Sequence, residues 1–256
     1  MLVTLGSNTN IAAGASQTFQ YACNSVQNVF IHCDDDGTDA LKGFVTVQIG
    51  NDVICNDISF EALSKISLVN GGGQAYDNNA FFKIDFGSHI LEPLENLYIT
   101  LRASVAMTAF SVSANVNEGG VYEPLKYTNY SDSVFTDANT LAVYAWADAS
   151  LATDTTAFTI RNQAYSSTPQ VQSGVIQAMC QVQGDSAGIV ATLAKEIAIM
   201  AKNQVPLDTS INYSSTTIDG VVCVSAMPKT PTKANASAQQ GRAVLGSMTS
   251  SERKAL

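Results

Sequence analysis

Charged residues are scarce in this chain of 256 residues, where they make up 14%, against about 25% in an average soluble domain. Apolar residues reach 46%, and small polar residues fill much of the remainder. Such a surface suits a protein that buries much of its exterior against neighbours, because little charge must then be desolvated. A weakly charged soluble or secreted domain is the alternative interpretation.

The sequence also lacks long apolar runs and paired cysteines. No apolar run reaches the roughly 18 residues that a membrane-spanning helix needs, and Met1–Thr4 lacks the features of a signal peptide. The five cysteines include no CxxC pair, so the sequence predicts neither a disulfide framework nor a zinc site. Cys23, Cys33 and Cys223 lie in apolar runs, and we expect them to be small buried hydrophobic residues of a protein made in a reducing compartment.

Positive charge is scarce in most of the chain, whose formal net charge is −9. Residues 1–228 hold 8 Lys and Arg against 21 Asp and Glu, which argues against sequence-specific nucleic acid binding by the body. Residues 229–256 are basic, because they contain a single Glu and five basic residues: Lys229, Lys233, Arg242, Arg253 and Lys254. This basic end is expected to dock on an acidic partner such as a sister subunit; a solubilising disordered end is the alternative.

Short β-type runs separated by turns recur along the chain and predict an all-β fold. They form two sets, which predict two tandem jelly-roll β-sandwiches at residues 1–118 and 119–228, followed by a C-terminal extension at residues 229–256. The clearest runs are Thr18–Cys23, Asn28–Cys33, Phe44–Ile49, Phe81–Phe86, Leu97–Leu101 and Val105–Val116 in the first set, and Val121–Tyr127, Leu141–Ala147, Ala157–Arg161, Val171–Val182 and Val221–Ala226 in the second.

One helix is predicted in each set. The first is capped by Asp57 or Ser59, and Gly71 to Gly73 end it. Its apolar positions are Phe60, Leu63 and Ile66. The second is expected over Ala187–Asn203 and ends before Pro206. Its apolar stripe consists of Ile189, Leu193, Ile197 and Met200.

The opening Leu5–Ser16, with Asn8-Thr9-Asn10-Ile11-Ala12-Ala13-Gly14 within it, resembles the start of corticovirus-type major capsid proteins of membrane-containing icosahedral bacteriophages. The order of strands and helices over residues 1–228 is also similar. The resemblance implies a double jelly roll whose homotrimers form pseudo-hexagonal capsomers around an internal membrane. It carries over no site residues.

The resemblance further implies a structural protein of the virion, made in the host cytoplasm, without catalytic residues or a cofactor. Its partners would be copies of itself, neighbouring capsomers, and other capsid or membrane proteins of the virion. The basic extension would contact acidic subunit surfaces or anionic lipid.

A serine hydrolase is the main enzymatic alternative, because Gly184–Gly188 matches the pattern G-x-S-x-G around Ser186. A serine nucleophile needs a histidine base, and the sequence offers only His32 and His89. Both precede Ser186, which excludes the α/β-hydrolase order of serine, acid and histidine. The simpler interpretation is that Asp185 or Ser186 caps the second helix.

A chymotrypsin-like order of histidine, aspartate and serine remains, with His32 as base, Asp77 or Asp85 as acid and Ser186 as nucleophile. Against it, Ser186 would open a helix, whereas this nucleophile lies between strands of a β-barrel. A third hypothesis is a β-sandwich that binds a receptor or a sugar, as in a spike protein.

A cluster of aspartates at Asp34–Asp39 predicts a structural calcium ion held by Asp34, Asp36 and Asp39, because calcium takes six to eight oxygen ligands. The loop is not an EF-hand, since Gly43 stands where the bidentate Glu would be. A plain hairpin turn is the alternative.

Asp34→Asn combined with Asp36→Asn keeps the side-chain size and removes two charges. If this loop holds calcium, added calcium should raise the melting temperature of the assembled wild-type protein, and the double variant should lose that rise. A rise that persists in the double variant would place the ion elsewhere.

Overall fold

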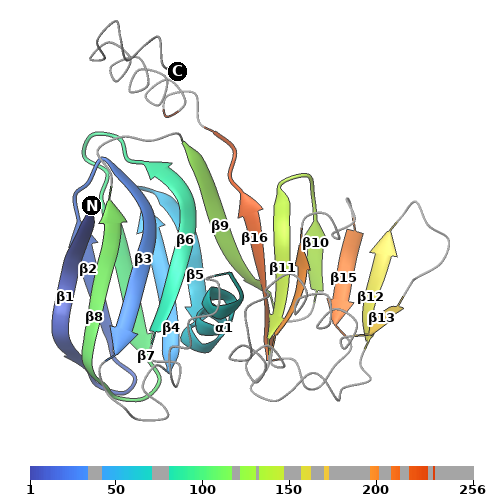
Figure 1. The fold of residues 1–256 in the computed structure, drawn as a ribbon, viewed down its shortest axis with the longest axis horizontal. Coiled ribbons are helices and arrows are strands. Elements are labelled where there is room, and N and C mark those ends of the chain that lie inside the picture. Colours follow the sequence, from blue (N-terminus) through green and yellow to red (C-terminus); the bar gives the residue numbers. More distant parts are fainter. Residues whose placement is uncertain are drawn as a thin grey trace, which may run out of the picture.

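The computed structural model describes residues 1–33, 42–70, 81–116, 122–130, 133–146, 157–162, 170–172, 197–201, 209–213, 219–229 and 233. Within these ranges the chain forms β-strands and their connecting turns, apart from helix α1 (Phe60–Asn70) and the helical residue Lys233 (Figure 1). No helix in the described ranges is long and apolar enough to cross a membrane.

The first eight strands form two four-stranded antiparallel sheets that face each other. One sheet has the order β1-β8-β3-β6, made of Leu2–Ile11, Met107–Val116, Ser25–Cys33 and Phe81–Ile90. The other has the order β5-β4-β7-β2, made of Asp52–Ser59, Gly43–Ile49, Leu97–Ala103 and Ser16–Tyr21. Pairing the first strand with the eighth and the second with the seventh gives the double Greek key of a jelly roll.

The next eight strands repeat this order. One sheet runs β9-β16-β11-β14, made of Glu123–Tyr130, Gly220–Ala226, Thr140–Trp146 and Ile197–Ala201. The other runs β10-β15-β12-β13, made of Ser133–Thr136, Thr209–Tyr213, Ala157–Asn162 and Gln170–Gln172. Counted from β9, the strands pair as first with eighth, eighth with third and third with sixth, as in the first set. The predicted tandem jelly-roll fold is therefore confirmed.

Alternating side chains build the core of the first sandwich. Val45, Val47 and Ile49 of β4 are fully buried and alternate with half-buried neighbours, as the period of two predicts. Phe19 of β2 meets Phe110 of β8 from the opposite sheet, edge to face with ring centroids 6.1 Å apart. The two sheets thus interlock through aromatic and β-branched side chains.

Helix α1 begins at a polar cap, as predicted. Ser59 Oγ accepts a hydrogen bond from the backbone N–H of Glu61 at 3.2 Å, so Ser59 is the cap. Asp57 has a positive φ of 49° and instead binds Arg102 through both carboxylate oxygens, at 2.8 and 2.7 Å. The predicted apolar positions of the helix are all buried: Phe60, Leu63 and Ile66.

The sequence patterns predict neither β1 nor β5. The middle of β1 is polar, and its pairing with β8 contains three register shifts, so its apolar residues do not keep a strict period of two. The pairing of β5 with β4 is likewise irregular, and Asp57 adopts a left-handed conformation within it. Irregular strands lack the alternation on which strand prediction depends.

The predicted helix over Ala187–Asn203 is wrong for its described part, because Ile197–Ala201 forms strand β14. This strand pairs with β11 from Trp146↔Ile197 to Ala142↔Ala201. The segment Ile-Ala-Ile-Met-Ala fits a short strand as well as a helical stripe, and a distant partner strand decides between them. Residues 187–196 and 202–203 lie outside the described ranges, as does Val171–Val182 beyond β13.

Candidate functional site: the junction between the two sandwiches

Strand β9 joins the two sandwiches. On one side it pairs with β16 of its own sandwich, and on the other it pairs with β6 through Gly87↔Pro124 and Ser88↔Glu123. It also meets β5 in parallel at Cys55↔Tyr127. Because β5 and β6 are the end strands of the two sheets of the first sandwich, β9 covers both edges (Figure 1).

A glycine in β6 makes this approach sterically feasible. Gly87 has a φ of +70°, which is a left-handed conformation that favours glycine. A Cβ atom at this position would collide with the carbonyl oxygen of Glu123 and lie 3.0 Å from the Leu125 side chain. The backbone of β9 therefore occupies the space that a side chain at position 87 of β6 would need.

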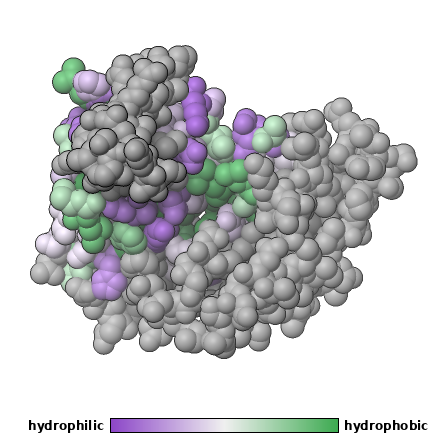
Figure 2. All heavy atoms as spheres, turned by 45° about the horizontal axis from the view of Figure 1, so that its top comes forward, coloured by the Kyte–Doolittle hydropathy of each residue, from purple (hydrophilic) through white to green (hydrophobic). Residues whose placement is uncertain are grey.

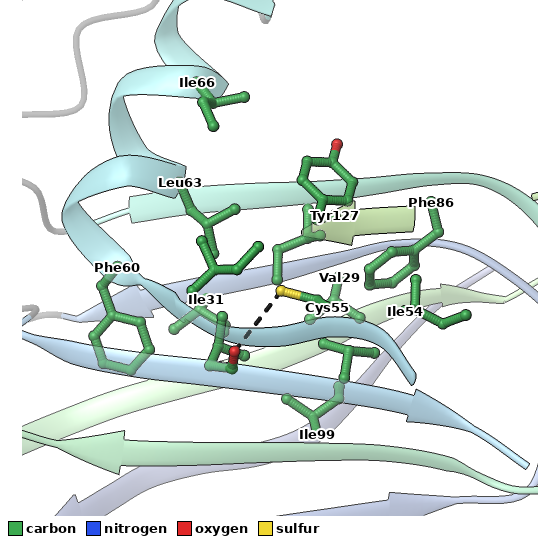
Figure 3. Packing of buried hydrophobic residues seen from close by; sticks show 14 of the residues in the cluster. Val29, Ile31, Ile54, Cys55, Phe60, Leu63, Ile66, Phe86, Ile99 and Tyr127 are labelled. Carbon is green, nitrogen blue, oxygen red and sulfur yellow. Dashed lines mark hydrogen bonds between the residues drawn. The ribbon is translucent and has the colours of Figure 1, made fainter. Parts of the chain in front are cut away.

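Tyr127 of β9 reaches into the first sandwich. Figure 3 shows its ring among α1, β5 and β6, close to Cys55 and Phe86. Its hydroxyl donates a hydrogen bond to the Asp85 carbonyl at 2.9 Å, and burial raises the pKa of that hydroxyl. One side chain thus brings apolar area and a satisfied polar group from the second half of the chain into the core of the first.

The three cysteines whose side chains are described are neutral thiols at pH 7. Burial raises the pKa of Cys55, whose Sγ donates to the Val45 carbonyl at 3.7 Å. Burial also raises the pKa of Cys23 and of Cys223 to about 11, so both remain neutral thiols at pH 7. The predicted burial is confirmed for Cys223, Cys23 is half-buried, and the side chain of Cys33 lies outside the described residues.

A buried histidine of β6 contacts the start of β9. His89 is 0% exposed, and its Nε2 lies 3.3 Å from the Leu125 carbonyl oxygen. Its ring makes edge-to-face contacts with Phe86 and Tyr122, at centroid distances of 6.3 and 6.1 Å. Burial lowers the pKa of His89 to about 4, and the hydrogen bond that His89 donates to the Leu125 carbonyl opposes this only in part. The imidazole is therefore neutral at pH 7.

The basic extension enters the same region through Lys233. Its side chain is 4% exposed, and its Nζ lies 3.2 Å from Glu95 Oε2 and 3.6 Å from Asp52 Oδ2. The ammonium also lies 5.9 Å from the centroid of the Tyr122 ring. Burial acts to lower the pKa of Lys233, but Glu95, Tyr122 and Asp52 together raise it, so the lysine is charged.

The two carboxylates that bind Lys233, those of Asp52 and Glu95, lie beside turns that hydrogen bonds hold in place. Glu95 Oε2 accepts a hydrogen bond from the backbone N–H of Glu92 at 2.7 Å, which fixes the carboxylate in the β6–β7 turn. Gly50, in the β4–β5 turn, donates its N–H to the Asn96 carbonyl at 3.0 Å. The predicted docking of the extension on acidic groups thus has one described instance, Lys233, and its partners belong to the same chain.

The lone tryptophan lies at a second contact between the halves. Trp146 of β11 is buried, and the Lys65 ammonium of α1 lies 5.3 Å from the centroid of its ring. Gly220 of β16 packs on the indole edge, where a Cβ atom would lie 2.8 Å from Nε1. Trp146 is therefore a built-in fluorescent reporter of the junction.

The structure does not bring His32 and Asp85 together as a catalytic pair. His32 stands opposite Phe81 and Asp85 opposite Asn28, so the two positions are four residues apart along paired strands, or roughly 13 Å. The Asp85 carboxylate instead binds Lys83 Nζ at 3.0 Å and the Gly87 N–H at 3.1 Å. Asp77 and Ser186, like Gly184–Gly188, lie outside the described residues.

The calcium ligands Asp34, Asp36 and Asp39 also lie outside the described residues, so calcium binding stays a prediction. In the described part of the chain, no three His, Cys, Asp or Glu side chains are grouped so that they could hold a metal ion.

The sequence patterns do not identify the junction. Its residues come from β5, β6, β9 and the extension, which are far apart in the chain. Gly87, which interrupts the apolar alternation of Phe81–Phe86, is a signal for close backbone approach within a strand. It indicates where a neighbour comes close, but not which segment the neighbour is.

Gly87→Ala should lower the free energy of unfolding by about 3 kcal/mol, from the left-handed backbone and the collision with Glu123. Gly14→Ala is the matched control, because Gly14 has a φ of +75° with nothing within 4 Å of the new Cβ. It should cost only about 1 kcal/mol. Denaturation followed by Trp146 fluorescence measures both, and equal losses would contradict the role of Gly87.

The His89 pKa predicts acid destabilisation. The unfolded chain takes up a proton near pH 6.5, whereas the folded chain takes it up only near pH 4, so stability falls as the pH drops through this window. The difference in free energy of unfolding between wild type and His89→Phe should fall by about 3 kcal/mol from pH 7 to pH 4. A difference that does not change with pH would contradict a buried neutral His89.

Comparison with known proteins shows that the fold of this chain is similar to that of a solved structure, without detectable similarity to a known sequence family. No protein-family model and no curated protein sequence matches the chain. Among solved structures, the major capsid protein P2 from bacteriophage PM2 aligns with a TM-score of 0.57, at 10% identity, over 90% of this chain and 98% of that one. The PBSX exported protein XepA aligns over 89% of this chain and 86% of its own at 7% identity, with a TM-score of only 0.29, which is too low to indicate a shared fold. The chain thus has the fold of a jelly-roll phage capsid protein.

Proposed function

We propose that this protein is the major capsid subunit of a membrane-containing icosahedral bacteriophage. Three copies associate into a pseudo-hexagonal trimer, and trimers tile a shell around an internal membrane. In this role the protein is a component of the virion, made in the host cytoplasm, and it acts by self-association without catalysis.

The repeated strand order carries this proposal. Two sandwiches of the same topology stand in one chain, so three chains present six similar units to a lattice. The likeness to the PM2 capsid protein spans almost the whole of both chains, which supports a role that uses both sandwiches together.

The surface is consistent with burial in an assembly. Viewed with the top of Figure 1 turned forward, the described residues show hydrophilic and hydrophobic side chains interspersed, with a hydrophobic group near the middle (Figure 2). A mixed surface of low charge resembles the composition of protein–protein interfaces, in which charged residues are depleted at the core.

The basic extension would serve the contacts of the capsomer with its surroundings. Lys233 is engaged within the chain, and we infer that Lys229, Arg242, Arg253 and Lys254 contact acidic subunit surfaces or anionic lipid. Lys229 is exposed, in keeping with this use. Other capsid or membrane proteins of the virion would be the remaining partners.

Native mass spectrometry of the purified full chain tests the proposal. We expect a dominant species of three times 27.0 kDa at micromolar concentration, because edges shared between copies must be covered. A chain that stays monomeric over this range would count against a capsid subunit and favour a hydrolase or a receptor-binding module.

A further inference from the structure

The sheet of strands β5, β4, β7 and β2 is electrically neutral, although the body of the protein is acidic. Its strands lie wholly in the described part of the chain, and their charged side chains are Asp52, Asp57 and Arg102. Arg102 binds Asp57 at 2.7 Å, and Asp52 lies 3.6 Å from Lys233 Nζ. Each charge of the sheet is thus paired, whereas residues 1–228 as a whole hold 21 Asp and Glu against 8 Lys and Arg.

The outer face of this sheet consists of straight rows of polar side chains. β2 pairs with β7, and β7 with β4, without a register shift, so residues at one level line up across three strands. Each residue of these rows is exposed or half-buried and is next to a buried residue of its own strand, so it points outward. One row is Thr18, Thr100 and Thr46, and the next is Gln20, Tyr98 and Gln48.

The side chains of these rows can pair with copies of themselves. Thr and Tyr hydroxyls and Gln amides all both donate and accept hydrogen bonds, and Thr18 Oγ1 and Thr100 Oγ1 already share one at 2.9 Å. A surface with unpaired carboxylates that met its own copy would suffer repulsion between like charges. A neutral surface that holds both donors and acceptors meets its own copy without that cost.

The composition of the rows also favours burial in an interface. A threonine side chain is branched at Cβ and has few rotamers to lose. Tyr98 stands at the centre of its row, and tyrosine is one of the residue types that anchor protein–protein interfaces. One level beyond the threonine row, the guanidinium carbon of Arg102 lies 4.4 Å from the centroid of the Phe44 ring, so this end of the face is packed in place.

The size of the face decides which contact between copies it can make. Four strands about 4.8 Å apart, each with about seven residues at a rise of about 3.3 Å, cover about 400 Å² per copy. A standard stable interface buries about 800 Å² per partner, so this contact is weak by itself. Weak contacts become effective when an assembly repeats them. A surface that meets itself also makes a two-fold contact, which cannot build a three-fold trimer.

We propose that the outer face of the β5-β4-β7-β2 sheet packs against the same face of a second copy across a two-fold axis that passes near Thr100. This inference rests on the proposed capsid function and names a contact that joins neighbouring trimers. Because the face binds its own copy, both sides of the contact consist of the same described residues.

Thr100→Glu tests the contact, because Thr100 lies at the centre of the face and is half-buried in the single chain. The matched control is Ser113→Glu, since Ser113 is a half-buried residue in the middle of the opposite sheet, between Thr4 and Phe30. Light scattering and sedimentation velocity follow the association of full-length protein beyond the trimer from micromolar to millimolar concentration. Circular dichroism and melting temperature check that each variant is folded.

We expect Thr100→Glu to weaken association beyond the trimer roughly tenfold or more, because the two-fold axis brings the new carboxylates of both copies together. Thr100→Lys should weaken it for the same reason. An equimolar mixture of the two variants should restore association, because opposite charges then meet across the axis. Ser113→Glu should associate like the wild type.

Hydroxyl-radical labelling gives a second measurement, which uses only the wild type. The labelling of Tyr98 should fall several-fold when trimers associate, because the contact buries its ring. The labelling of Phe30 should stay unchanged, because Phe30 lies between the buried residues Val29 and Ile31 and so points outward from the opposite sheet. If a Thr100 variant does not fold, the labelling of Tyr98 decides alone.

The outcomes separate this contact from the proposed function. A wild type that forms no trimer overturns the capsid function, and the contact between trimers fails with it. Trimers whose further association survives Thr100→Glu, or is not restored in the mixture, overturn only the contact proposed here. Trimers that do not associate at millimolar concentration and keep their Tyr98 labelling also overturn it, as does equal weakening by Ser113→Glu.

Discussion

The close backbone approach of β9 to β6 at Gly87 is the contact on which the arrangement of the two sandwiches depends. It covers the end strand of the first sandwich with the first strand of the second, and Tyr127 then reaches the core beneath. A side chain at position 87 would occupy the place of the Glu123 carbonyl. A single missing Cβ atom thus permits two sandwiches to share edges that would otherwise attract other chains.

Two buried polar side chains, those of His89 and Lys233, lie near this contact. His89 is neutral because burial outweighs its hydrogen bond to Leu125, and Lys233 is charged because Glu95 and Asp52 lie beside it. Buried ion pairs stabilise weakly but are costly to break, because removing one partner leaves the other charge buried alone. These groups therefore specify how the extension and the turns of the first sandwich fit together more than they add to stability.

The need to cover the edges of a sheet is met within the chain at the junction. Within the chain, the edge of the first sandwich is covered by β9, and the apolar start of β9 is covered in return. Met1 and Leu2, at the start of β1, are by contrast largely exposed.

Local patterns carried much of the architecture. The alternation in β4 and β7 identifies buried strands, and Ser59 before Phe60 identifies a capped helix, because these signals reside in side chains that are neighbours in sequence. The hypothesis of a hydrolase shows the limit of such signals. His32 and Asp85 occur in a suitable order, but the strand register holds them four positions apart.

The sequence by itself determined that the chain is an all-β protein of two similar halves with a basic end. Only the tertiary structure decided that Ile197–Ala201 is a strand, that polar β1 belongs to a sheet, and that Lys233 binds Asp52 and Glu95. Periodicity fixes which face of a strand is buried, but the partner of a strand comes from a distant segment. The free energy of that pairing overrides local preference wherever the local pattern is ambiguous.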